Sequence, residues 1–108
     1  MQTDETIKRF GLKESTIHKI ISVFTKHPKI EKALLYGSRA KGNYRNGSDI
    51  DLTLIGDQLS YSHLGSIELD IDDLLLPYSF DISIFKDIDN PDLVDHINRV
   101  GVVFYEKI

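Results

Sequence analysis

The chain has 108 residues, of which 41% are hydrophobic and 28% charged, and this composition and length predict one globular domain spanning residues 1–108. The net charge of −4 disfavours a general nucleic-acid binder, and the lack of cysteine excludes disulfides and thiolate metal sites. No apolar run approaches the ~20 residues that cross a bilayer, and the N-terminus lacks the basic start and apolar core of a signal peptide, so we expect a cytoplasmic protein with no membrane partner.

The first part of the chain predicts a helix, a buried strand and a short turn. Apolar side chains recur at helical spacing over residues 13–27, and the apolar run Lys32–Tyr36 is typical of a buried strand. Residues 38–42 begin a short helix or turn directly after Gly37. A polar loop with an Asn-Gly turn signal follows over residues 43–48.

The middle of the chain predicts two strands and a helix between them. Residues Asp49–Ile55 alternate as a strand on which the two aspartates share one face. Residues 62–75 carry apolar side chains at helical spacing, although residues 67–72 also alternate like a strand. The longer helical match favours a helix there. Residues Phe80–Phe85 alternate as the second strand.

A helix and a strand complete the chain. Asn90-Pro91 combines a capping residue with proline at the first helical position, and the helix is expected to end near Arg99, before Gly101. Val102–Tyr105 is expected to form the last strand. Helices and strands alternate, which predicts an α/β fold with helices packed on a sheet.

A candidate phosphate site follows the first predicted strand. Gly37 lacks a Cβ and lets backbone amides approach an anion, and N–H groups at a helix start attract phosphate. Ser38 adds a hydroxyl donor, and Arg39, Lys41 and Arg45 would neutralise a triphosphate. The alternative is an ordinary turn beside solvated basic side chains, which is the more frequent meaning of a short glycine motif.

A candidate metal site lies on the next predicted strand. Asp49 and Asp51 sit ~6.6 Å apart along one strand face, where their side chains can converge on one Mg²⁺ or hold two ions ~3.5–4 Å apart. Asp81 interrupts an otherwise apolar strand. If the two strands pair in register, Asp81 joins the same face as a ligand or a general base. The alternatives are a solvated strand face for the aspartate pair and an exposed edge strand for Asp81.

Other polar residues are expected to lie outside the site. Asp70-Ile71-Asp72 repeats the acidic pattern, but no Gly-Ser turn precedes it, and on a helix Asp70 and Asp72 point in different directions. Tyr36 and Tyr78 are expected to pack in the core. The histidines show no metal-ligand spacing and are expected to be surface or packing residues: His18, His27, His63 and His96.

Together these residues resemble the signature of nucleotidyltransferases of the DNA polymerase β superfamily, in which Gly-Ser is followed after ten residues by Asp-x-Asp. Residues 37–42 read Gly-Ser-Arg-Ala-Lys-Gly and resemble the family's Gly-Ser-Arg-Ala-Arg-Gly, with Lys41 in place of the second arginine. The approach Leu76-Pro77-Tyr78 to Asp81 and the closing segment 100–106 also resemble the family.

The resemblance implies a mixed sheet with the carboxylates on one face, and transfer of a nucleotidyl group to an acceptor hydroxyl with release of pyrophosphate. The donor would be ATP or another nucleoside triphosphate, and the cofactor would be Mg²⁺ as one or two ions. The resemblance implies nucleotide binding by Gly37, Ser38, Arg39 and Lys41, and catalysis and metal binding by Asp49, Asp51 and Asp81.

Stand-alone domains of this kind resemble antitoxins that adenylylate a tyrosine of a HEPN-domain toxin and silence it. Larger relatives carry an acceptor-binding domain, so we expect the acceptor surface to come from a HEPN or other helical substrate-binding protein of a neighbouring gene, or from a homodimer mate. Two alternatives stay open. One is a catalytically weak antitoxin that acts by binding; the other is a small-molecule nucleotidyltransferase that depends on a second subunit.

Overall fold

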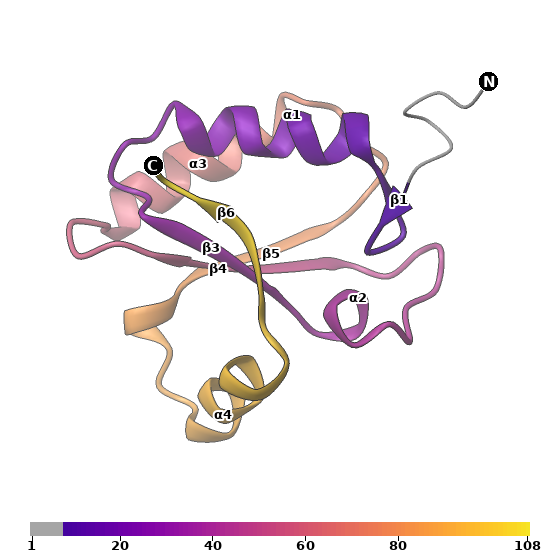
Figure 1. Cartoon of the computed structure of the whole chain (residues 1–108). Coiled ribbons are helices and arrows are strands. Elements are labelled where there is room, and N and C mark those ends of the chain that lie inside the picture. Colours follow the sequence, from indigo (N-terminus) through magenta and orange to yellow (C-terminus); the bar gives the residue numbers. More distant parts are fainter. Residues whose placement is uncertain (1–7) are drawn as a thin grey trace.

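The structure, a computed structural model, describes residues 8–108 and is built around a four-stranded mixed sheet (Figure 1). The sheet has the strand order β5-β4-β3-β6, with β5 at Phe80–Ile84, β4 at Ile50–Ile55, β3 at Lys32–Tyr36 and β6 at Val102–Glu106. Strand β3 is antiparallel to β4 and to β6, whereas β4 and β5 are parallel. A parallel pair requires a crossover connection, which helix α3 (Tyr61–Asp72) supplies.

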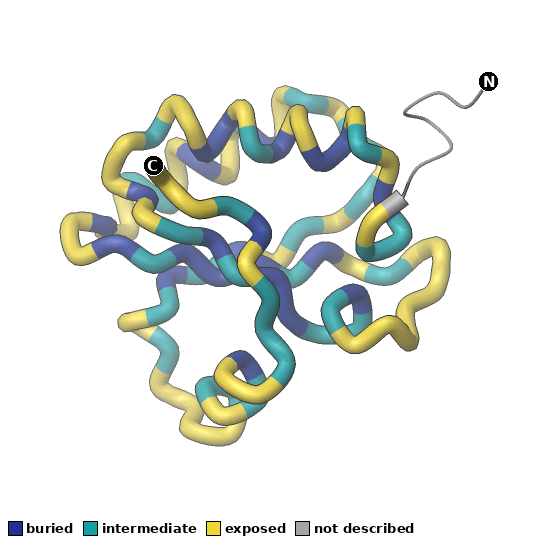
Figure 2. The backbone as a smooth tube through the Cα atoms, in the orientation of Figure 1, coloured by how far each residue is buried: buried dark blue, intermediate teal, exposed yellow. Residues whose placement is uncertain are grey.

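Helices cover the two faces of the sheet unequally. Helices α1 (Glu14–Thr25) and α3 lie over one face, and α4 (Pro91–Val100) lies on the other (Figure 1). The single-turn helix α2 (Ser38–Lys41) follows β3 directly. Most of the buried residues lie in α1, α3 and the sheet strands, and the loops are mainly exposed (Figure 2).

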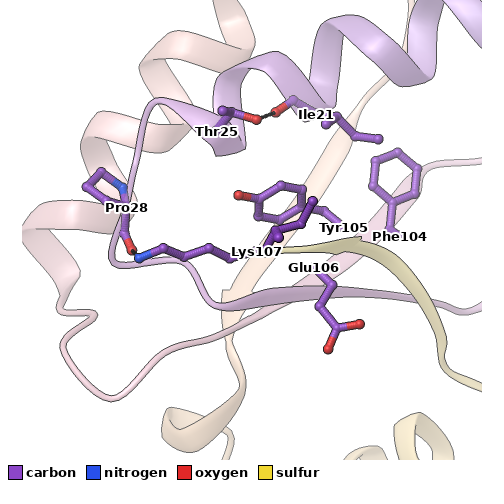
Figure 3. A pocket seen from close by; sticks show the side chains of 8 residues that line it. Ile21, Thr25, Pro28, Phe104, Tyr105, Glu106 and Lys107 are labelled. Carbon is purple, nitrogen blue, oxygen red and sulfur yellow. Dashed lines mark hydrogen bonds between the residues drawn. The ribbon is translucent and has the colours of Figure 1, made fainter.

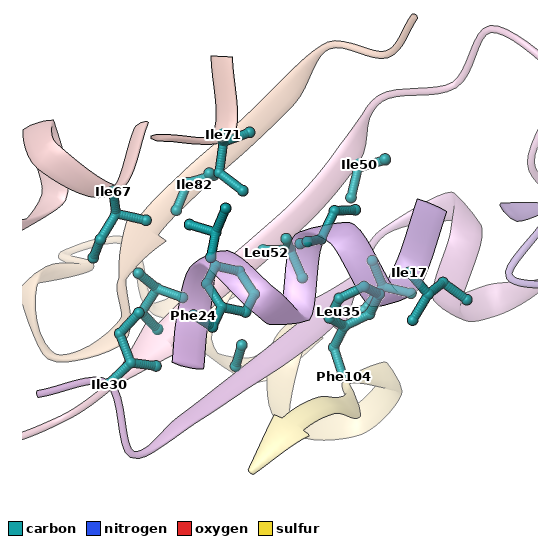
Figure 4. Close-up of a cluster of buried hydrophobic side chains, with 14 of the residues drawn as sticks. Ile17, Phe24, Ile30, Leu35, Ile50, Leu52, Ile67, Ile71, Ile82 and Phe104 are labelled. Carbon is teal, nitrogen blue, oxygen red and sulfur yellow. The ribbon is translucent and has the colours of Figure 1, made fainter. Parts of the chain in front are cut away.

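The hydrophobic core fills the space between the sheet and the helices α1 and α3 (Figure 4). Its fully buried members include Ile17, Phe24, Leu35, Ile50 and Leu52. Each such side chain contributes roughly 1.5–3 kcal/mol by leaving water. This core holds β4 in place, so the residues that alternate with Ile50 and Leu52 are carried on a rigid strand.

The predicted α/β elements are confirmed, with bounds that shift by a few residues. The strand alternative for residues 67–72 is wrong, because they belong to α3, which ends at Asp72, earlier than expected. The Asn90 cap is confirmed, since its Oδ1 accepts a hydrogen bond of 2.9 Å from Asp92 N. Gly101 ends α4 with φ −63°; a Cβ there would lie 2.4 Å from the Ile97 carbonyl oxygen.

Three small elements were not predicted. Strands β1 (Lys8–Arg9) and β2 (Leu12–Lys13) form an antiparallel hairpin, and the 3-10 helix η2 (Phe85–Asp87) replaces the expected last residue of β5. Elements of two or three residues are too short to produce a readable period. None of the helices within residues 8–108 combines the length and the apolar character needed to span a membrane.

Candidate active site

Sheet register gathers the predicted carboxylates at one end of the sheet. Asp51 lies opposite Tyr36 of antiparallel β3 and opposite Asp81 of parallel β5. Asp51 and Asp81 therefore stand side by side on one face, as the strand alternation suggested. Asp49 is exposed immediately before β4, and Asp81 is exposed on the edge strand. Asp51 and Asp81 thus belong to the β4–β5 pair, and Asp49 belongs to the loop directly before β4.

Gly37 joins the predicted phosphate turn to these carboxylates. Its φ of +76° lies in the left-handed region, and a Cβ at this position would lie 2.3 Å from Asp51 Oδ2. Glycine is therefore required both by the backbone and by the neighbouring side chain. The turn is closed by hydrogen bonds from Lys41 N to Gly37 O (3.1 Å) and from Gly42 N to Ser38 O (2.9 Å). The phosphate turn and Asp51 are thus in direct contact.

The electrostatics of the carboxylates favour a bound cation. Burial raises the pKa of Asp51, and the neighbouring charges of Asp81 and Asp49 raise that pKa further. Within residues 8–108, no three histidine or acidic side chains are already arranged as a metal cage. Mg²⁺ is typically held by one or two carboxylates together with substrate phosphates rather than by an all-protein cage. The oxygen donors present here therefore fit Mg²⁺.

Tyr36 and His96 border the carboxylates, and neither was predicted as a site residue. Tyr36 is 6% exposed, which confirms the expected packing role, and the His96 ring of α4 meets its ring edge-on at 6.2 Å. Burial, then the charges of Asp81 and Asp51, raise the pKa of Tyr36. Two residues further along β5 and β4, Ser83 Oγ donates a hydrogen bond of 3.0 Å to Thr53 Oγ1. Sequence spacing could not reveal this packing of α4 on β3, because the contact is tertiary.

The two predicted basic residues of α2 lie in different environments. Lys41 is exposed, whereas Arg39 is only 2% exposed. The Arg39 guanidinium donates to the carbonyl oxygens of Phe10, Asn46 and Ser48. This geometry departs from the expectation that Arg39 neutralises a triphosphate, because its donors point to backbone oxygens inside the protein.

A separate groove of 590 Å³ lies between α1 and the end of β6, at the other end of the sheet (Figure 3). Glu106 in this groove pairs with Lys32 at the start of β3, whereas Asp51 pairs with Tyr36 at its end. The lining residues are Ile21, Thr25, Pro28, Phe104, Tyr105, Glu106, Lys107 and Ile108. The groove therefore does not include the predicted carboxylates.

Comparison with known proteins gives one family match and several solved structures with a similar fold. A family model described as polymerase beta, nucleotidyltransferase matches residues 18–108. The fold is similar to a chain of a toxin–antitoxin crystal structure with AMP-PNP (TM-score 0.68, 19% identity, 84% of this chain and 73% of that chain). It is also similar to a chain of the tri-AMPylated Shewanella oneidensis HEPN toxin in complex with MNT antitoxin (TM-score 0.65, 17% identity, 87% and 72%).

A putative nucleotidyltransferase from Sulfolobus solfataricus also shares the fold (TM-score 0.53, 19% identity, 94% of this chain and 91% of that chain). Sequence comparison with curated proteins gave no significant match. The family model nevertheless covers most of the chain and includes β3, α2, β4 and β5. The chain therefore belongs to the polymerase β nucleotidyltransferase family.

Proposed function

We propose that this chain is a Mg²⁺-dependent nucleotidyltransferase that transfers an adenylyl group from ATP to a tyrosine hydroxyl of a HEPN toxin and so acts as its antitoxin. The observation that carries the proposal is the register that sets Asp51 beside Asp81 and against Gly37. A phosphate turn in contact with paired carboxylates suits a triphosphate bound with a divalent cation. Family membership supports the reaction class.

Each site residue has a defined task in this proposal. Asp49, Asp51 and Asp81 would hold Mg²⁺, which supplies charge neutralisation at the triphosphate when bound. The backbone at Gly37 and the hydroxyl of Ser38 would donate hydrogen bonds to phosphate oxygens.

Asp81, in a second role, and Lys41 would act on the reacting groups. Asp81, exposed on the edge strand β5, would accept the proton of the acceptor hydroxyl. The acceptor oxygen then forms a bond to the α-phosphorus, and the bond to pyrophosphate breaks. Lys41, exposed on α2, would neutralise charge on the departing pyrophosphate.

The acceptor proposal is supported by two structures that share the fold. One is a toxin–antitoxin complex with AMP-PNP, and the other contains a tri-AMPylated HEPN toxin with an MNT antitoxin. A cytoplasmic complex between this chain and a HEPN partner would bring an acceptor tyrosine to Asp81. The sheet face that carries Asp51 and Asp81 is opposite the face covered by α1 and α3; α4 lies on it as well, and Asp81 is exposed on the edge strand, where an acceptor could approach.

The test is to incubate the protein with labelled ATP, Mg²⁺ and the HEPN-domain product of a neighbouring gene. We expect label on a partner tyrosine, located by mass spectrometry, and loss of label with Asp51→Asn. Asp72→Asn is the matched control, because it makes the same change on an exposed helix residue. Tight binding without label, equal for wild type and Asp51→Asn, would instead indicate an antitoxin that acts by contact alone.

A further inference from the structure

Arg39 is a buried cation whose hydrogen-bond partners are backbone carbonyls. Its Nη1 donates to Phe10 O at 2.8 Å, and its Nε and Nη2 donate to Ser48 O at 3.2 and 2.9 Å. A second contact of Nη2 reaches Asn46 O at 3.4 Å. A buried charge is costly unless its donors are paired. The satisfied geometry therefore indicates a specific structural task for this side chain.

Two aromatic rings complete the surroundings of the guanidinium. The Arg39 Cζ atom lies 5.4 Å from the ring centre of Tyr44 and 5.2 Å from that of Tyr78. Both distances are in the range of cation–π attraction. A planar guanidinium can contact two rings and donate several hydrogen bonds in its plane, whereas a lysine ammonium cannot reproduce this fork. The surroundings are therefore specific for arginine.

The segments that contact Arg39 also carry the candidate carboxylates. Ser48 immediately precedes Asp49, and Tyr78 lies three residues before Asp81. Arg39 itself belongs to the turn that begins at Gly37 and touches Asp51. The guanidinium thus lies where the phosphate turn, the loop before β4 and the approach to β5 meet.

The N-terminal hairpin is fitted to the same junction. Phe10 and Gly11, which form its turn, have φ values of +60° and +72°. A Cβ on Gly11 would lie 2.3 Å from Tyr44 Cε2 and 2.9 Å from Arg39 Nη1. The hairpin lies outside the region matched by the family model, which starts at residue 18. It nevertheless supplies one of the carbonyls that hold Arg39.

We propose that Arg39 is a positioning residue that ties the hairpin turn, the loop before Asp49 and the approach to Asp81 into one unit. Arg39 would influence the rate of adenylyl transfer by positioning the carboxylates, and it would not contact the triphosphate. Its effect on transfer rests on the proposed function, whereas its effect on the loop rests on these contacts alone.

The test compares Arg39→Lys with Arg99→Lys, a matched substitution of an exposed arginine that pairs with Asp95 on α4. Amide hydrogen exchange over residues 42–49 is measured without nucleotide. We expect exchange there to become roughly tenfold faster or more in Arg39→Lys, because the loop loses its anchor. We also expect kcat for adenylyl transfer to fall by roughly ten- to a hundredfold, with a smaller change in the KM for ATP. Arg99→Lys should change neither.

Unchanged exchange over residues 42–49 in a folded Arg39→Lys protein would overturn the proposal. A raised KM for ATP with unchanged kcat would also overturn it, since that result indicates a phosphate contact. If Arg39→Lys does not fold, Tyr44→Leu removes one ring and keeps the hydrogen bonds, and it should accelerate exchange in the same segment; no acceleration would overturn the proposal. The exchange measurement needs no transfer reaction, so it is independent of whether the proposed function holds.

Discussion

The tripeptide Asp-Ile-Asp occurs three times, at residues 49–51, 70–72 and 87–89, and the first two copies place their isoleucine in the hydrophobic core. In these two copies the isoleucine is buried to a similar extent, Ile50 at 0% and Ile71 at 2% exposure. The first copy enters strand β4, and the second lies in the last turn of α3. Identical side chains on the two elements therefore meet different neighbours.

The difference between the two copies comes from backbone geometry and not from composition. On the strand, Asp51 is held between Gly37 and Asp81, in a row of like charges. On the helix, Asp70 Oδ2 meets His27 Nε2 at 2.7 Å, and Asp72 is exposed at the helix end. A cation would relieve the repulsion in the first arrangement, whereas Asp70 in the second is already paired with His27. The same two carboxylates are thus brought beside a third, Asp81, only where they lie at the start of a sheet strand.

The largest expected effect separates the two copies by activity. Asp51→Asn should reduce adenylyl transfer about a thousandfold or more, since metal-assisted charge stabilisation contributes several kcal/mol. Asp72→Asn should leave the rate within about twofold, because this exposed residue lies outside the site. Initial rates with labelled ATP and the HEPN partner measure both. Comparable losses in the two variants would show that the copies are not functionally distinct.

The contact between Gly37 and Asp51 gives the next effect. Gly37→Ala and Gly42→Ala both place a Cβ at positive φ, +76° and +91°, and each should cost about 1–2 kcal/mol of unfolding free energy. Only the first Cβ meets Asp51, since nothing lies within 4 Å of a Cβ at Gly42. Gly37→Ala should therefore also lower the transfer rate by roughly a hundredfold.

Urea denaturation and initial rates together separate these two contributions. Equal transfer rates in Gly37→Ala and Gly42→Ala, at similar stability, would mean that the position of Asp51 does not depend on the turn. The comparison is matched because both glycines flank the same single-turn helix α2.

Most of the fold and the centre of the site could be predicted, because both depend on local periods. Apolar spacing is readable within one helix or strand. Side chains alternate between the two faces of a strand, so Asp81 lies on the face of Asp51 once the two strands pair in register. The surroundings of Arg39 could not be predicted, because its carbonyl partners lie at residues 10, 46 and 48 and carry no side-chain signal. The sequence Gly-Ser-Arg is the same whether the arginine side chain contacts a phosphate or backbone carbonyl groups.

The raised pKa of Asp51 predicts a pH-dependent stability difference. Burial is the main cause of this raised pKa, followed by the charges of Asp81 and Asp49. The folded protein therefore keeps a proton on Asp51 at pH values where the unfolded chain has lost it. The unfolding free energy of wild type then falls as pH rises from the ordinary pKa of 3.8 through the raised pKa. The Asp51→Asn side chain does not titrate, so the unfolding free energy of this variant does not fall for this reason.

Without divalent cation, Asp51→Asn should therefore be more stable than wild type above this window, by about 1 kcal/mol or less because solvent screens the half-exposed group. The difference should vanish below pH 3.8, where Asp51 is protonated in both states. Added Mg²⁺ should stabilise wild type more than the variant, because ligand binding favours the folded state. Urea titrations at several pH values measure these differences, and a variant less stable than wild type at neutral pH would contradict the prediction.

The smallest expected effect concerns the helical copy. Asp70→Asn weakens the contact with His27, whose side chain is 20% exposed against 44% for Asp70. Partly exposed pairs of this kind contribute about 1 kcal/mol or less, so the unfolding free energy should drop by no more than that. A double-mutant cycle with His27→Gln isolates the pair from other effects of each substitution. The rate of adenylyl transfer should stay unchanged in all three variants, because Asp70 is paired with His27 and lies outside the candidate site. A changed rate would mean that α3 influences the site through the core beneath β4.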